Sequence, residues 1–257
     1  MFADAGLLGI IFIFYFFYAF YDLIKDCIAS FKHGYHGEEN QHNPVITEDM
    51  IQEAMQNKTY GNFTLTPAVV LFKDGDVIPS EGYKVEKLVM SDDNIRSRIL
   101  VSASAEKILD IFDECISLLG DTCSIVLEDF RTDKGDHIDH FAYYKDTFIV
   151  RSVLFDFEEL LLNDGFVGLA IWSETAQAEV QLTMHKIILV YAADISRFKA
   201  ALASFGIKED PELRFFFEDF HLLVSTEAGN TAIETLKDRL YIDHSIVQAG
   251  GPEEMSN

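Results

Sequence analysis

The sequence has few cysteines and none of the short motifs that mark common enzyme families. Three cysteines in 257 residues cannot form the disulfide framework of a small secreted domain. The chain contains no phosphate-binding P-loop, no nucleophile elbow, no HExxH zinc motif and no CxxC pair. Cys115 falls in a predicted helix and Cys123 in a predicted strand, so both are expected to be reduced core residues. These absences leave the reaction, and whether there is one, undetermined.

Positive charge is also scarce. The chain carries 20 Lys and Arg residues against 43 Asp and Glu residues, which gives a formal net charge of -23 at pH 7. Such an acidic protein is repelled by the phosphates of nucleic acid, so we expect no nucleic-acid partner. Another membrane protein or a basic protein surface is the expected partner.

One long segment lacks charge altogether. Seventeen consecutive residues from Ala5 to Tyr21 are uncharged, and eight of the ten residues from Phe12 to Tyr21 are aromatic. With its flanking apolar residues, a helix of this segment reaches the ~30 Å thickness of a bilayer core. The side chains expected to face lipid are Leu7, Leu8, Ile10, Ile11, Phe12, Phe14, Phe16, Phe17, Tyr18 and Phe20.

Residues 1–32 are therefore predicted to form a single-pass membrane anchor. A buried helix and a helix lying flat on the membrane are the alternatives, although a flat helix needs a charged face. A cleaved signal peptide is disfavoured because no Lys or Arg precedes the apolar run. Lys25 and Lys32 follow it, so the positive-inside rule places the main domain in the cytoplasm.

The rest of the chain divides by composition. Hairpin-linked strands with helices between them predict an α+β fold, with a mainly antiparallel sheet and helices on one face. An Asp-Gly pair predicts a hairpin that joins residues 69–72 to residues 77–78. The predicted segments are a polar linker at 33–44, a small helix plus hairpin at 45–97, an α+β domain at 98–245 and a flexible tail at 246–257.

An internal repeat is visible in the α+β domain. Helices predicted at 104–119 and 194–205 each follow a strand, end at a glycine and precede three apolar residues and Glu-Asp-Phe. A duplication would make residues 215–220 a strand equivalent to 125–130, although chance could also produce this order because strand–helix–strand units are common.

The repeat would place two acidic pairs in matching positions. The pairs are Glu128-Asp129 and Glu218-Asp219. Because side chains alternate across a strand, one acid of each pair would face the core side, where a buried carboxylate needs a partner. Strand ends exposed to water are the simpler interpretation.

The densest group of candidate ligands lies at residues 133–140. Asp136, His137, Asp139 and His140 offer carboxylate and imidazole groups that hold a divalent metal when a turn brings them together. A solvated polar loop is the simpler interpretation. No other cofactor is indicated.

Three functions are compatible with these observations. The apolar N-terminus, the acidic charge and the missing catalytic motifs favour an interaction or accessory subunit of a membrane-associated complex. The alternatives are a metal-dependent hydrolase built on the Asp/His cluster at 133–140 and a regulatory domain that binds a small ligand between the repeated units.

Overall fold

The larger of two units in the chain contains the main fold. It comprises Ile46–Leu88 and Arg96–Asn257. The computed structural model describes residues 56, 58–72, 75–89, 95–131, 138–219, 221–225, 227–242 and 247–248. The predicted membrane anchor, the linker and the last nine residues of the tail lie outside these described residues.

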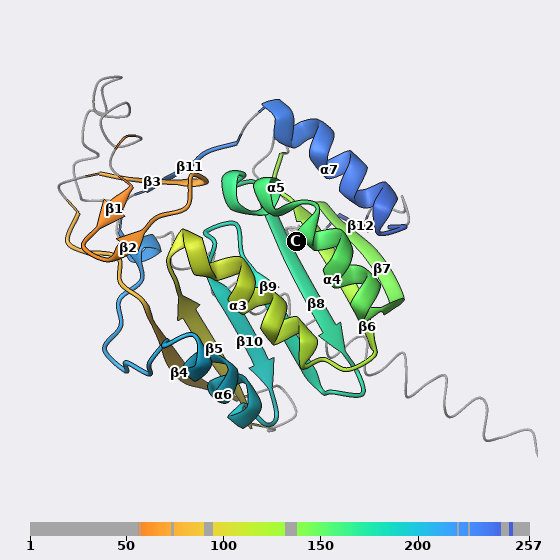
Figure 1. The fold of residues 1–257 in the computed structure, drawn as a ribbon, viewed down its shortest axis with the longest axis horizontal. Coiled ribbons are helices and arrows are strands. Elements are labelled where there is room, and N and C mark those ends of the chain that lie inside the picture. Colours follow the sequence, from red (N-terminus) through yellow and green to blue (C-terminus); the bar gives the residue numbers. More distant parts are fainter. Residues whose placement is uncertain are drawn as a thin grey trace, which may run out of the picture. The chain divides into compact units, whose positions relative to one another are not determined.

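An eight-stranded sheet forms the centre of the fold (Figure 1). Its strands lie in the order β12-β7-β6-β8-β9-β10-β5-β4, and the pairs from β12 through β5 are all antiparallel. The predicted α+β fold with a large antiparallel sheet is therefore confirmed. The strands are β4 (Gly82–Val89), β5 (Ile95–Ser102), β6 (Thr122–Asp129), β7 (Ile138–Asp146), β8 (Val167–Ser173), β9 (Ala178–Leu182), β10 (Ile188–Ala192) and β12 (Val247–Gln248).

Helix α3 lies at the centre of a helical layer in front of the sheet in Figure 1. It contacts α4, α5 and α6, while α7 contacts α5. The helices are α3 (Ala105–Ser117), α4 (Thr147–Phe155), α5 (Glu158–Asn163), α6 (Ser196–Ser204) and α7 (Glu227–Arg239). On α3 the apolar residues recur at helical spacing, and those it buries are Ile108, Ile111, Phe112, Cys115 and Ile116.

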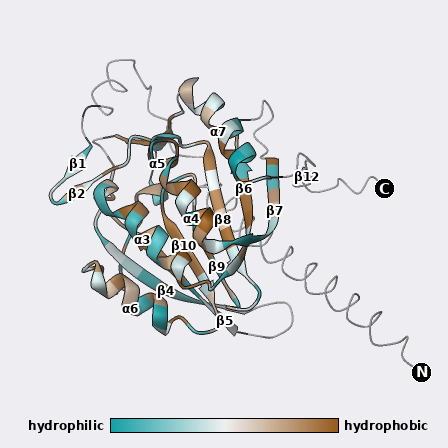
Figure 2. Ribbon diagram, turned by 45° about the vertical axis from the view of Figure 1, so that its right-hand side comes forward, coloured by the Kyte–Doolittle hydropathy of each residue, from teal (hydrophilic) through white to brown (hydrophobic). Residues whose placement is uncertain are grey.

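The central strands carry the apolar residues of the core. Strands β8 and β10 are buried along their whole length, and Figure 2 shows hydrophobic residues concentrated along these strands. The only tryptophan, Trp172, lies on β8 and is buried, with its ring edge-on to Tyr143. Cys115 and Cys123 are free and buried, which confirms them as reduced core residues.

The predicted hairpin at 69–78 is wrong. Strand β3 (Val69–Leu71) pairs instead with β11 (His221–Leu223), about 150 residues later in the chain. The backbone N–H groups of Asp76 and Val77 donate to the carboxylate of Asp219, which holds this segment as a loop. A contact between distant residues has therefore replaced the local turn.

The second predicted repeat unit also differs from the prediction. Phe216–Glu218 forms a short 3-10 helix instead of a strand. The carboxylate of Glu218 accepts a hydrogen bond from the backbone N–H of Phe215 at 2.9 Å, which closes the turn locally. The two predicted repeat units therefore share a strand and a helix but not the element that follows the helix.

A short hairpin precedes β3. It pairs β1 (Thr59–Tyr60) with β2 (Phe63–Thr64).

Candidate functional site

The structure places two of the four predicted metal ligands. Asp139 and His140 are consecutive residues of β7, paired with Glu128 and Leu127 respectively, so their side chains point to opposite faces of the sheet. Asp136 and His137 lie outside the described residues. Within the described part of the chain, no group of three or more His, Cys, Asp or Glu side chains could hold a metal ion. The complete four-residue site stays a prediction.

The two acidic pairs occupy different environments. Glu128 lies against Gly168 of β8, where an added Cβ would overlap the glutamate carboxylate, so the glycine makes room for this acid. Asp129 points to the other face and forms ion pairs with Arg131 and Lys237. Glu218 and Asp219 instead bind backbone N–H groups outside the large sheet. The predicted equivalence of the pairs is not seen in their surroundings.

Asp129 belongs to a buried ionic cluster between β6, β8 and α7. Asp164, which is 1% exposed, accepts hydrogen bonds from Arg131 and from the hydroxyl of Ser225. An added Cβ at Gly229 would overlap the Asp164 carboxylate, so the glycine lets α7 approach the cluster closely.

Lys186 adds a third cation to this cluster. Its Nζ donates to the carbonyl oxygen of Val167 at 2.9 Å. The pKa of Lys186 is lowered to about 7, mainly by burial; the carboxylate of Asp164 opposes this shift and the nearby Arg131 adds to it. No local sequence pattern indicates the cluster, because its members come from β6, α7 and several loops that are distant in the chain.

Two histidines lie beside the cluster in the interior. The rings of His185 and His221 are 4.9 Å apart, and the ring of Phe217 is 5.5 Å from that of His185. Burial lowers the pKa of His185 to about 3, and the charges of His221 and Lys186 act in the same direction. Burial also lowers the pKa of His221, against the influence of Asp219. At neutral pH both rings are therefore uncharged.

The most distinctive surface feature is helix α4. Six of its nine residues are apolar, although it lies at the surface. Val150, Val153 and Leu154 face the core, whereas Phe148, Ile149 and Phe155 are 78%, 58% and 72% exposed. We call these three exposed residues the α4 surface. Helix α4 has more apolar residues than its core-facing side uses, and this excess was the sequence signal that could have revealed the surface.

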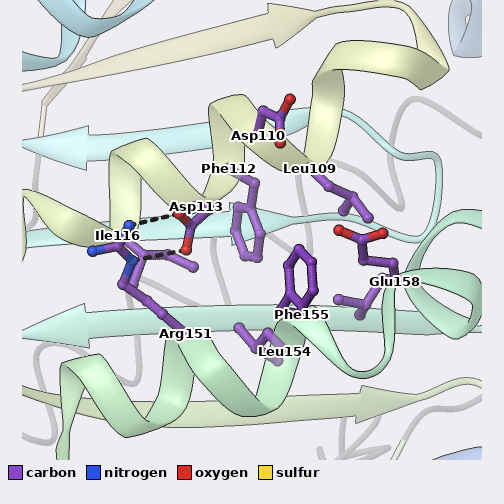
Figure 3. A pocket seen from close by; sticks show the side chains of 10 residues that line it. Leu109, Asp110, Phe112, Asp113, Ile116, Arg151, Leu154, Phe155 and Glu158 are labelled. Atoms are coloured by element: carbon purple, nitrogen blue, oxygen red, sulfur yellow. Dashed lines mark hydrogen bonds and ion pairs between the residues drawn. The ribbon is translucent and has the colours of Figure 1, made fainter.

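A small groove between α3, α4 and α5 adjoins the α4 surface (Figure 3). Its cavity volume is about 150 Å³. Phe112 and Phe155 both line the groove, and Figure 3 shows the Arg151–Asp113 ion pair at one end and Glu158 at the other. The guanidinium of Arg151 donates to both carboxylate oxygens of Asp113, at 2.7 and 2.6 Å. The groove therefore combines an apolar floor with fixed charges at its ends.

Acidic side chains surround the groove and the α4 surface. Asp110 on α3 and Glu158 and Glu159 on α5 are exposed. Two cations in this region are paired with carboxylates, Arg151 with Asp113 and Arg239 with Asp156. The rim is therefore negative, in keeping with the charge of the whole chain. Such a surface can bind apolar side chains and positive charge together.

Comparison with known proteins identifies no relative. No protein-family model matches the chain, and no curated protein or solved structure matches it significantly. Among the described residues, no helix is both long and apolar enough to span a bilayer. The predicted anchor at residues 1–32 falls outside this description and stays a prediction.

Proposed function

We propose that this protein is a membrane-anchored interaction or accessory subunit that docks a partner protein through the α4 surface. The supporting observation is the exposure of Phe148, Ile149 and Phe155 on one short helix. With about 200 Å² for a whole aromatic side chain, the three expose on the order of 400 Å². Contiguous apolar patches of this size on soluble domains are often binding sites.

The free energy available at this surface is substantial. Full burial of a Phe or Ile side chain contributes about 1.5–3 kcal/mol each. The fold leaves this free energy unused, because Val150, Val153 and Leu154 fill the core side of α4 and the three exposed side chains remain in water. Docking of a partner that covers them would release it.

The size of the groove favours a protein partner over a small substrate. Small-molecule sites usually enclose about 300–1,000 Å³. The groove between α3 and α4 has about half of the lower value. It therefore suits one or two side chains of a docked segment.

Site-specific photo-crosslinking in cells of the source organism tests the docking proposal. A photoreactive phenylalanine analogue is placed at Phe148 or Phe155 of the full-length protein, with Ile78, which is 75% exposed elsewhere, as the matched control. We expect a discrete adduct with another protein from positions 148 and 155 but not from 78. Equal adducts at all three positions, or none, would refute the proposal.

Fractionation tests the proposed membrane anchor. The full-length protein is expected in the membrane fraction, and deletion of residues 1–24 is expected to release it. If the full-length protein is found in the soluble pool and the deletion leaves its location unchanged, the anchor is wrong.

A further inference from the structure

We infer that the segment docked on the α4 surface is a basic amphipathic helix of the partner protein. This inference rests on the proposed function and specifies the chemistry of its partner. Three features support it: the spacing of the exposed aromatic residues, the groove beside them and the negative rim.

The geometry of the site suits a helix. Phe148 and Phe155 are seven residues apart on α4, so they lie on the same side of the helix about 10 Å apart along its axis. The groove between α3, α4 and α5 is lined by Phe155 and has room for one or two side chains (Figure 3). A helix that lies along α4 and places one apolar side chain in the groove would reach Phe148 with a second, because residues i and i+7 of a helix span the same two turns.

The charge of the rim selects a basic partner. Asp110 and Glu158 line the groove, and Glu159 is the exposed residue that follows Glu158 on α5. Lys or Arg side chains flanking the apolar positions of a bound helix would meet these carboxylates. Their attraction would increase the association rate and select against acidic partners.

A second copy of this chain suits the site poorly. In a twofold contact between α4 helices, the same surface would meet itself, so the acids of one rim would approach those of the other. Each copy also carries a net charge of -23. Basic helices are, by contrast, common where membrane spans enter the cytoplasm, because positive residues gather there. The proposed anchor would hold the acidic domain at that location.

Binding of a designed helical peptide to the full-length protein tests the inference. The probe is a peptide of about 18 residues, roughly 27 Å as a helix, with Leu on one face and Lys on the other. A peptide of the same composition in scrambled order and one with Glu in place of Lys are the controls. We expect saturable binding of the Lys peptide alone, weakening as salt concentration rises.

Variants of the protein locate the binding site. The double change Phe148→Ser and Phe155→Ser is expected to weaken binding about tenfold or more, because two anchor contacts are lost. Glu158→Lys should weaken binding several-fold and reduce its dependence on salt. Ile78→Ser and Glu174→Lys change exposed residues elsewhere and should leave the affinity unchanged. Thermal unfolding verifies that each variant is folded.

Several outcomes would overturn the inference. Equal binding to the variants and the wild type would show adsorption to acidic protein in general. A concentration-dependent dimer that Phe148→Ser abolishes would assign the surface to a second copy. An adduct within the chain, from position 148 to residues 1–32, would assign it to the N-terminal segment. If adducts to another protein form at positions 148 and 155 but the Lys peptide does not bind, the inference fails while the proposed function stands.

Discussion

The buried histidine His185 predicts a specific loss of stability in acid. Its ring is 4% exposed and contacts the rings of His221 and Phe217. Burial, with His221 and Lys186 nearby, lowers its pKa to about 3 from an ordinary value of 6.5. Between these two pH values the unfolded chain binds a proton at this residue and the native protein does not. Stability contributed by His185 is therefore present above pH 6.5 and falls as the pH is lowered.

The magnitude follows from linkage. A pH of 5 is 1.5 units below the pKa of 6.5 that this histidine has in the unfolded chain. Each pH unit changes the free energy of unfolding by about 1.4 kcal/mol, so the protein loses about 2 kcal/mol of stability. This value does not depend on the native pKa, provided that it stays well below 5. Replacement by Phe keeps an aromatic ring in contact with Phe217 and removes the ionisable group.

Urea unfolding at pH 8 and pH 5, followed by the fluorescence of buried Trp172, measures the effect. The wild type should lose about 2 kcal/mol more than His185→Phe between the two pH values. His221 and His140, whose pKa values are also lowered by burial, titrate in both proteins and cancel in the difference. An identical pH dependence in the two proteins would refute the argument that His185 is held neutral in the fold.

Two further predictions concern the same end of the sheet. Because the pKa of Lys186 is lowered to about 7 from 10.5, the unfolded state holds the extra proton between these values, so stability should rise with pH by up to about 1.4 kcal/mol per unit there. Urea titrations at pH 7 and 9.5 should show that Lys186→Met no longer gains stability between these pH values. If the variant gains as much as the wild type, Lys186 is not the group responsible. A Cβ at Gly165 would lie 2.7 Å from the backbone carbonyl oxygen of Ala68, so Gly165→Ala should destabilise by about 1–3 kcal/mol. Gly168→Ala would overlap most strongly with the carboxylate of Glu128, a flexible side-chain end that can move, and should lower the melting temperature less than Gly165→Ala; the reverse order would be evidence against this packing.

Local signals in the sequence located several elements well. The helices predicted at 104–119 and 194–205 correspond to α3 and α6, and the glycines that follow them, Gly120 and Gly206, have positive φ angles of 86° and 77°. Glycine adopts that conformation without strain, so it commonly ends a helix at this position. Ser104 stands at the N-cap of α3, but its hydroxyl accepts a hydrogen bond from the backbone N–H of Thr64 instead of capping the helix.

The failures occurred where strand pairing overrode the local pattern, with an adjacent strand at β7 and with a distant strand at β3. The sequence predicts a polar loop at the start of β7, because Asp139 and His140 are typical of a solvated turn. Pairing with β6 instead makes this segment a strand, with Asp139 and His140 on opposite faces of the sheet. Strand β3 likewise pairs with β11 and not with its neighbour in sequence. Propensity decides such segments only when no stronger long-range pairing competes.

The acidic charge follows from composition, and the apolar N-terminal run and the ends of the main helices follow from residue types a few positions apart. The pairing of the strands, the burial of charges around Asp164 and the exposed side of α4 became known only from the folded chain. These features depend on which distant surfaces meet. That outcome is set by the packing of the whole chain, and no local pattern encodes it.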